Sequence, residues 1–98
     1  MTAYWINTFT AVRDEQRLAD YIALAGPAMR TAGGRFLARG LPEHVFEGAS
    51  ALRTTLIEFP SVDDAHRAYY SDAYQEALEV LGDGADREIR IIEALDEG

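Results

Sequence analysis

The sequence predicts an α+β fold in which four antiparallel strands form one sheet and two helices cover one of its faces. The hydrophobic pattern alternates between the two-residue repeat of strands and the three- to four-residue repeat of helices, and it gives the order β-α-β-β-α-β. This order is the split βαβ arrangement of ferredoxin-like folds. The chain of 98 residues has the length of one compact domain, so we expect a single domain over residues 1–98.

The first strand is expected over residues 3–9, where aromatic and β-branched side chains are frequent. Successive side chains of a strand point to opposite faces, so Trp5, Asn7 and Phe9 share one face. The intervening side chains include Tyr4, which is also large. This pattern indicates that both faces of the strand are covered.

The first helix is expected over residues 14–32, because apolar residues recur there at three- and four-residue steps. Asp14 is expected as its N-cap. Pro27 predicts a kink or a break near residues 25–26, since proline removes a backbone donor and clashes with the preceding turn. The glycine pair at 33–34 is expected to end the helix.

Residues 35–40 are expected to form the second strand, which ends at a Gly-Leu-Pro sequence. A short apolar piece follows at 44–47, and a clear strand pattern covers 52–59. These two pieces are either one bulged strand or two short strands, and residue propensity leaves both arrangements open.

The second helix is expected to begin after Ser61, which serves as its N-cap with Asp64 as capping-box partner. Its apolar stripe continues to Leu81, with an irregularity at residues 71–72, where another capping-type pair occurs. The last strand is expected over residues 88–95.

Every predicted strand carries apolar side chains on both faces, whereas the helices cover one face only. An uncovered second face would expose a larger apolar patch than monomers usually show. We therefore predict a homodimer whose sheets pack face to face.

The composition excludes several classes of function. The chain has 9 Lys and Arg against 17 Asp and Glu, and its net charge of −8 repels nucleic acids and anionic membranes. It contains no Cys and 2 His, so we expect no metal site and no cofactor. Its start resembles no targeting signal, and no segment approaches the roughly 18 apolar residues of a membrane-spanning helix, so we expect a cytoplasmic protein.

Short motifs in order along nearly the whole chain resemble those of the domain of unknown function 1330 family: YWI at 4–6, GGRFLARG at 33–40, EG at 47–48, IEFPS at 57–61 and YSDAYQ at 70–75. The resemblance implies a dimeric α/β barrel. Members of that superfamily include cofactor-free monooxygenases, haem-degrading monooxygenases, muconolactone isomerases and stress-response proteins. The family itself is uncharacterised, so the resemblance implies a fold and no defined reaction.

Two features depart from the family pattern. The family continues its second helix past the tyrosine-glutamine pair into an arginine and a further turn, whereas Leu81 is followed here by Gly-Asp-Gly. The family's glycine pair after the second strand is Gly40-Leu41 here. If the family arginine binds an anion in relatives, this chain has lost that part of the site.

His44 and Glu47 are the candidates for proton transfer, because a histidine beside a carboxylate can act as a general base near neutral pH. An exposed loop position with no catalytic role is the alternative for His44. The family motif includes the Glu47-Gly48 pair.

Arg35 and Arg39 lie four residues apart on the second predicted strand and are therefore expected on one face. Cross-strand pairing with Glu47 or Glu58 is one explanation for them. The other is bidentate binding of a ligand carboxylate.

Glu58 and three further residues are candidates for ligand binding. Tyr70 and Tyr74 are expected on one side of the second helix, where they face either the core or a cleft between helix and sheet. Asn7 either contributes to that cleft or satisfies a buried backbone group.

Two functions follow from these residues. The first is binding of a small aromatic or organic acid in a cleft between sheet and helices, with conversion by a cofactor-free, monooxygenase- or isomerase-like reaction if the protein is an enzyme. The second is a non-catalytic dimerising or stress-response interaction module.

Overall fold

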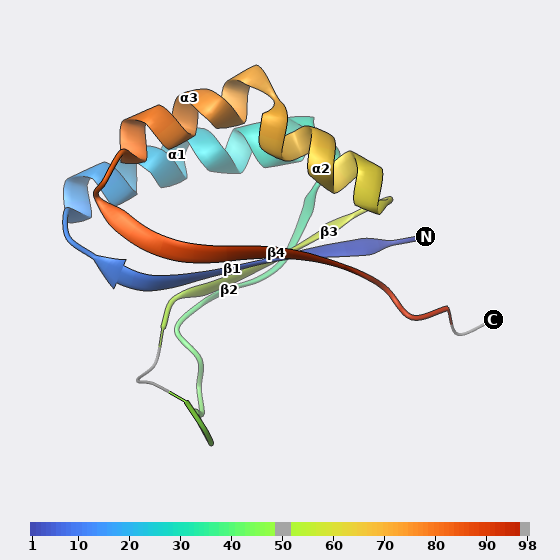
Figure 1. Ribbon diagram of the computed structural model, residues 1–98, viewed down its shortest axis with the longest axis horizontal. Helices are drawn as coiled ribbons and strands as arrows, with labels where there is room; N and C mark the ends of the chain where they lie inside the picture. Colours follow the sequence, from blue (N-terminus) through green and yellow to red (C-terminus); the bar gives the residue numbers. More distant parts are fainter. Residues whose placement is uncertain (49–51, 97–98) are drawn as a thin grey trace.

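The computed structural model describes residues 1–48 and 52–96. The elements are β1 (Ala3–Val12), α1 (Glu15–Thr31), β2 (Arg35–Gly40), β3 (Thr54–Phe59), α2 (Val62–Tyr70), α3 (Asp72–Leu81) and β4 (Ala85–Glu93). The strands form a 4-stranded sheet in the order β2-β3-β1-β4, and every neighbouring pair is antiparallel. All helices lie on one side of this sheet (Figure 1). The predicted ferredoxin-like α+β fold is confirmed, with three helices in place of two.

The first helix agrees with the prediction except at its proline. The Asp14 side chain accepts hydrogen bonds from the backbone N–H groups of Gln16 and Arg17, as expected of an N-cap. Of the two predicted alternatives, a kink or a break near residues 25–26, the break is wrong, since α1 runs through Pro27 without interruption. Buried residues on both sides of the proline hold the helix against the sheet and α3, and this packing offsets the loss of one backbone hydrogen bond.

The irregularity predicted at residues 71–72 is confirmed as a complete break between α2 and α3. Ser71 has extended backbone angles and serves both as C-cap of α2 and as N-cap of α3. Its hydroxyl donates to the Ala68 carbonyl oxygen at 2.8 Å and accepts from the Tyr74 N–H at 3.3 Å. One side chain thus satisfies backbone groups of both helices at the break.

The strand boundaries agree with the prediction for β2 and differ elsewhere. Neither arrangement predicted for residues 44–47 is correct, because that piece lies in irregular structure and β3 begins only at Thr54. β4 begins earlier than predicted, at Ala85, because β1 continues to Val12 and offers the backbone partners.

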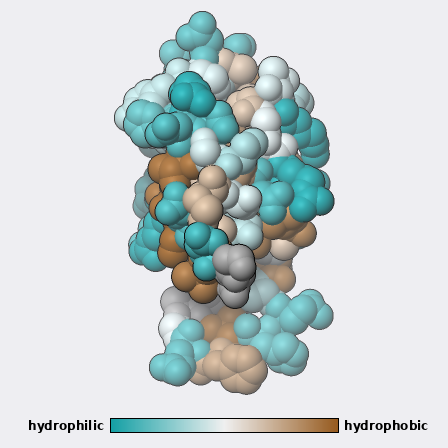
Figure 2. All heavy atoms as spheres, turned by 90° about the vertical axis from the view of Figure 1, so that its right-hand side faces the viewer, coloured by the Kyte–Doolittle hydropathy of each residue, from teal (hydrophilic) through white to brown (hydrophobic). Residues whose placement is uncertain are grey.

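Residues 41–48, which we call the arm, project from the end of β2 on the side of the sheet opposite the helices (Figure 1). All of these residues are exposed. Phe46 is 93% exposed. Figure 2 shows this part of the chain standing clear of the body of the molecule, with apolar atoms at its lower end.

The two faces of the sheet have different environments. Buried side chains of β1 and β3 alternate toward the helices and form the core with α1 and α3; these include Trp5, Phe9, Ile57 and Phe59. The opposite face, which no helix covers, carries Tyr4, Ile6, Leu56 and Ile92. Within the described part of the chain, no helix is long and apolar enough to cross a membrane.

A β-bulge in β2 overturns the prediction that Arg35 and Arg39 share a face. The register shifts by one residue between Phe36 and Ala38, so Arg35 lies opposite Glu58 and Arg39 lies opposite Thr55. Glu58 is on the uncovered face and Thr55 is on the helix-covered face. The extra residue reverses the side on which the rest of β2 places its side chains.

Gly34 joins α1 to β2 at a point without room for a side chain. A Cβ atom there would lie 2.9 Å from Ile57 Cγ2, from the Met29 carbonyl oxygen and from Phe59 Cζ.

Gly34→Ala should therefore lower the free energy of unfolding by about 1–3 kcal/mol, which urea denaturation measures. Gly26→Ala is the matched control, since its nearest contact is 3.4 Å to the flexible Arg30 side chain and alanine favours helix. Equal stability of the two variants would contradict this account of the packing.

Candidate functional site

A cavity lies between the helix-covered face of the sheet and α1. Its volume is 40 Å³, and residues of β1, α1, β2, β3 and α3 line it. A buried water needs about 10–15 Å³, so this form of the cavity holds only very small molecules. Much of its wall is aromatic, formed by Trp5, Phe9, Tyr21, Phe36 and Tyr74.

The rest of the wall includes a polar group of Asn7, Arg39, Arg53 and Thr55. Exposure falls from Arg39, which is exposed, through Arg53, which is half-buried, to Asn7, which is 5% exposed. The guanidinium carbon of Arg39 lies 5.3 Å from the centre of the Phe36 ring, a cation-π distance. Arg39 therefore stands at the mouth of the cavity and Asn7 stands deeper inside.

Two atoms of this polar group lack hydrogen-bond partners in the described part of the chain. They are Asn7 Oδ1 and Arg53 Nε, and both are buried. Buried polar atoms are nearly always hydrogen-bonded, because an unpaired one costs about 1–3 kcal/mol. The polar group thus offers one acceptor and one donor to a small molecule.

The backbone explains why two arginines meet at this point. The bulge in β2 directs Arg39 toward the helices, and the two-residue alternation of β3 extends back from Thr55 to Arg53. The Arg53 carbonyl oxygen accepts a 3.0 Å hydrogen bond from the Phe9 N–H, which fixes this residue beside β1. The two arginines therefore flank the chain segment that contains the arm.

A hydrogen-bonded tyrosine pair forms part of the aromatic wall. The hydroxyls of Tyr21 and Tyr74 are 2.7 Å apart, and both side chains are buried. Burial raises the pKa of Tyr21, and the adjacent Tyr74 adds to this shift. Burial also raises the pKa of Tyr74, against the opposing effects of the hydrogen bond to Tyr21 and of Arg87. Both hydroxyls are therefore neutral at physiological pH.

The cavity brings together three of the residues proposed from sequence: Asn7, Arg39 and Tyr74. Arg35 and Glu58 lie on the opposite face of the sheet, where their side chains form an ion pair at 3.3 Å. This is the cross-strand alternative that the sequence left open.

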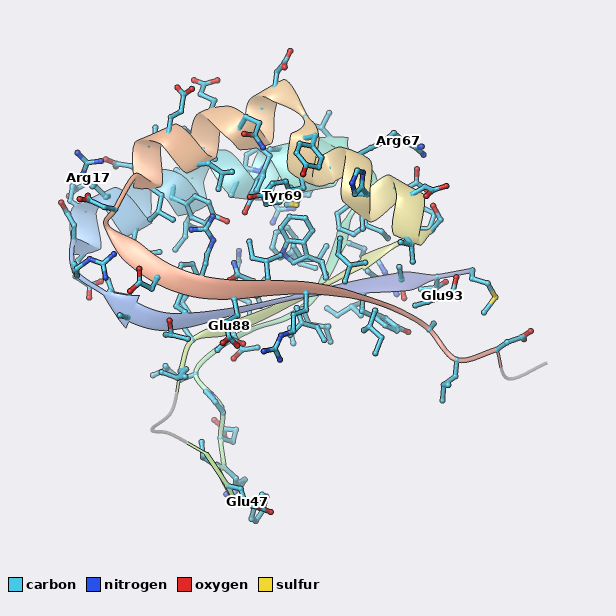
Figure 3. The ribbon with its side chains drawn as sticks, viewed as in Figure 1. Arg17, Glu47, Arg67, Tyr69, Glu88 and Glu93 are labelled. Atoms are coloured by element: carbon cyan, nitrogen blue, oxygen red, sulfur yellow. The ribbon has the colours of Figure 1, made fainter. Side chains whose placement is uncertain are left out.

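The other proposed residues lie away from the cavity. His44 and Glu47 belong to the exposed arm, and Figure 3 shows Glu47 at its tip, remote from the helices. Tyr70 is 63% exposed and contacts His66, with ring centres 5.0 Å apart. The prediction that Tyr70 and Tyr74 share one side of a helix is wrong, because Ser71 separates their helices. Tyr69 instead points from α2 toward the sheet (Figure 3).

Sequence reasoning missed Arg53, although the sequence contained a signal for it. Thr55, Ile57 and Phe59 occupy alternate positions on the buried face of β3. Continuing this alternation toward the N-terminus assigns Arg53 to the same face. An arginine on a buried face needs an explanation, and here the cavity provides it.

The model of the family described as Domain of unknown function (DUF1330) matches residues 2–95. The chain belongs to this family. No curated protein matches the sequence of this DUF1330 protein.

Solved structures with the same fold come from several bacteria. A protein of unknown function from Rhodopseudomonas palustris, RPA0582, is 18% identical, with a TM-score of 0.77 over 97% of this chain and 83% of its own. SnoaB, a cofactor-independent oxygenase from Streptomyces nogalater, is 14% identical, with a TM-score of 0.69. The match covers 97% of this chain and 94% of the SnoaB chain. A dimeric protein of unknown function and ferredoxin-like fold from Bacteroides fragilis is 16% identical, with a TM-score of 0.58. The match covers 95% of this chain and 96% of that protein's chain. The TM-scores show a shared fold.

The tyrosine pair predicts a loss of stability in alkali. The unfolded chain releases the tyrosine protons near pH ~10 while the folded chain retains them, so stability is fully present below pH ~10 and falls above it. Above pH ~10, each of the two tyrosines should lower the free energy of unfolding by about 1.4 kcal/mol per pH unit. Urea denaturation at about pH 9 and about pH 11 should show a smaller loss for the double variant Tyr21→Phe, Tyr74→Phe than for the wild type. The same loss in both proteins would contradict the burial of these hydroxyls.

Proposed function

We propose that this protein binds a small organic acid in the cavity between its sheet and α1. The observation that carries the proposal is the convergence of Arg39 and Arg53 on one aromatic-lined cavity whose polar atoms are incompletely paired. The chain has a net charge of −8, so two arginines at one cavity form a local site of positive charge within an acidic protein.

The ligand's carboxylate would lie against the two arginines, because a guanidinium donates two parallel hydrogen bonds to a carboxylate. Its apolar part would lie against the aromatic wall, as in most small-molecule sites. An aromatic acid needs more room than the 40 Å³ of this form. Ile22, Phe36 and Arg39 are only partly buried or exposed, so the cavity can enlarge at its mouth by movement of these side chains.

Chemical conversion of the acid without a cofactor is the finer form of this proposal. A cofactor-independent oxygenase, SnoaB, shares the fold, which supports the idea that such chemistry suits this architecture. Proton transfer by His44 and Glu47 remains a hypothesis that requires the arm to reach a neighbouring chain, since both residues are exposed away from their own cavity.

Phenylacetate should bind the protein saturably and raise its melting temperature, whereas neutral phenylacetamide should bind at least about tenfold more weakly, because only the acid makes charge-assisted hydrogen bonds. Arg39→Ala should weaken phenylacetate binding by about tenfold or more, measured by isothermal titration calorimetry. The matched control is Arg35→Ala, which removes an arginine of the same strand from the opposite face. Equal effects of the two substitutions, or equal affinity for acid and amide, would refute the proposal.

The second candidate function is dimerisation, through the sheet face that no helix covers. Its apolar side chains include Tyr4, Ile6 and Leu56, which are half-buried, and Ile92, which is exposed. The structurally similar protein from Bacteroides fragilis is described as dimeric, which supports the proposal.

The charges on this face are compatible with a second copy of an acidic chain. Arg35 pairs with Glu58 at 3.3 Å, and Arg90 pairs with Glu88 at 2.9 Å. Paired charges reduce the repulsion that the net charge of −8 would otherwise cause. The arm projects from the same side of the sheet, so each copy can pack Phe46 against its partner.

Phe46→Ser should weaken the dimer by about a hundredfold or more, because burying a phenylalanine contributes about 1.5–3 kcal/mol and a twofold-symmetric dimer buries it twice. Sedimentation velocity over a range of concentrations measures the dissociation constant. Tyr70→Ser is the matched control, since it removes an exposed aromatic side chain from α2, on the helix side of the sheet. A wild-type chain that stays monomeric, or an equal effect of both substitutions, would rule out this interface.

A further inference from the structure

A carboxylate alone leaves part of the polar group unpaired. Asn7 Oδ1 is a hydrogen-bond acceptor, is buried, and has no partner within the part of the chain that the structure describes. A carboxylate has no proton to donate to this oxygen and is repelled by it. A ligand that brings a donor as well as an anionic group would pair this oxygen too.

We propose that the ligand is a hydroxy acid whose hydroxyl lies next to its carboxylate, and that Asn7 selects it by accepting the hydroxyl hydrogen. This inference rests on the proposed binding of an organic acid and adds the identity of the second recognition group. The carboxylate accepts from Arg39 and from Arg53, whose buried Nε is the unpartnered donor.

The strand register places the acceptor and the donor close enough to contact one small molecule. Asn7 lies directly opposite Thr55 in the antiparallel pair of β1 and β3. Arg53 precedes Thr55 by two residues and therefore occupies the next position on the same face of the sheet. Side chains in such diagonal positions are about 7–8 Å apart at their backbones, which one ligand with adjacent polar groups can bridge.

The wall of the cavity argues against a dicarboxylic acid. Apart from its polar group, the lining is formed by aromatic and aliphatic residues of β1, α1, β2, β3 and α3, with the paired hydroxyls of Tyr21 and Tyr74. A second carboxylate on the ligand would find no cationic partner among these residues and would be costly to bury. A monoacid with one hydroxyl beside the carboxylate matches the available groups.

Pairs of probes that differ by the hydroxyl group alone test the inference. Glycolate is compared with acetate, and mandelate is compared with phenylacetate, by calorimetric titration of the wild-type protein. The hydroxy acid of each pair should bind about tenfold more tightly, since it makes one more hydrogen bond to a buried acceptor. O-Methylmandelate keeps the oxygen but lacks the donor, so it should lose this advantage.

Asn7→Leu removes the acceptor at similar volume and should abolish the difference in affinity between the hydroxy acid and its parent acid within each pair. Asn7→Ala provides a second test if the leucine variant fails to fold, and the comparisons of ligands on the wild-type protein stand without either variant.

Three outcomes are distinguishable. A preference for the hydroxy acids that is lost on substitution of Asn7 supports the inference. Equal affinity within each pair overturns it, leaves the binding of organic acids intact, and assigns Asn7 Oδ1 to a bound water. Absence of binding by all of these acids overturns both the proposed function and the inference that rests on it.

Discussion

One extra residue in β2 determines which face of the sheet Arg39 occupies, and therefore whether the cavity has an arginine at its mouth. Without the bulge between Phe36 and Ala38, strict alternation would place Arg39 on the same face as Arg35, away from the helices and the cavity. With the bulge, Arg39 moves to the helix-covered side and reaches the mouth of the cavity. The strand thus supplies one arginine to each face, with a surface ion pair on one side and a cavity-lining arginine on the other.

The rest of the cavity is positioned by packing of the core. Trp5 lies edge-on to Tyr74, with ring centres 5.4 Å apart, and the hydroxyl of Tyr74 bonds to that of Tyr21. These contacts join β1, α3 and α1, so the aromatic wall is rigid where the helices meet the sheet. The mouth is different, because Arg39 is exposed and Phe36 is only partly buried. A cavity that is rigid at its base and adaptable at its mouth suits ligands with a fixed polar group and a variable apolar part.

Local sequence patterns were sufficient to predict the order of the strands along the chain, the bounds of β2 and the N-caps of the helices, because local residue chemistry determines these features. It failed where one residue changes the geometry. Leu37 at the bulge carries no distinctive sequence signal, and therefore Arg39 was assigned to the wrong face. Ser71 was recognised as an irregularity, but the separation of Tyr70 from Tyr74 depends on how the two helices diverge. Arg53 could have been found from the alternation of β3.

The most direct test of this account observes the arginines themselves. In a proton-nitrogen correlation spectrum of the Nε–H groups, titration with phenylacetate should shift the signals of Arg39 and Arg53 and slow the exchange of their protons with water, because both groups would donate to the carboxylate. The signal of Arg35, on the other face, should not change. A shift of Arg35 with no change at Arg39 and Arg53 would contradict the assignment of the cavity as the binding site.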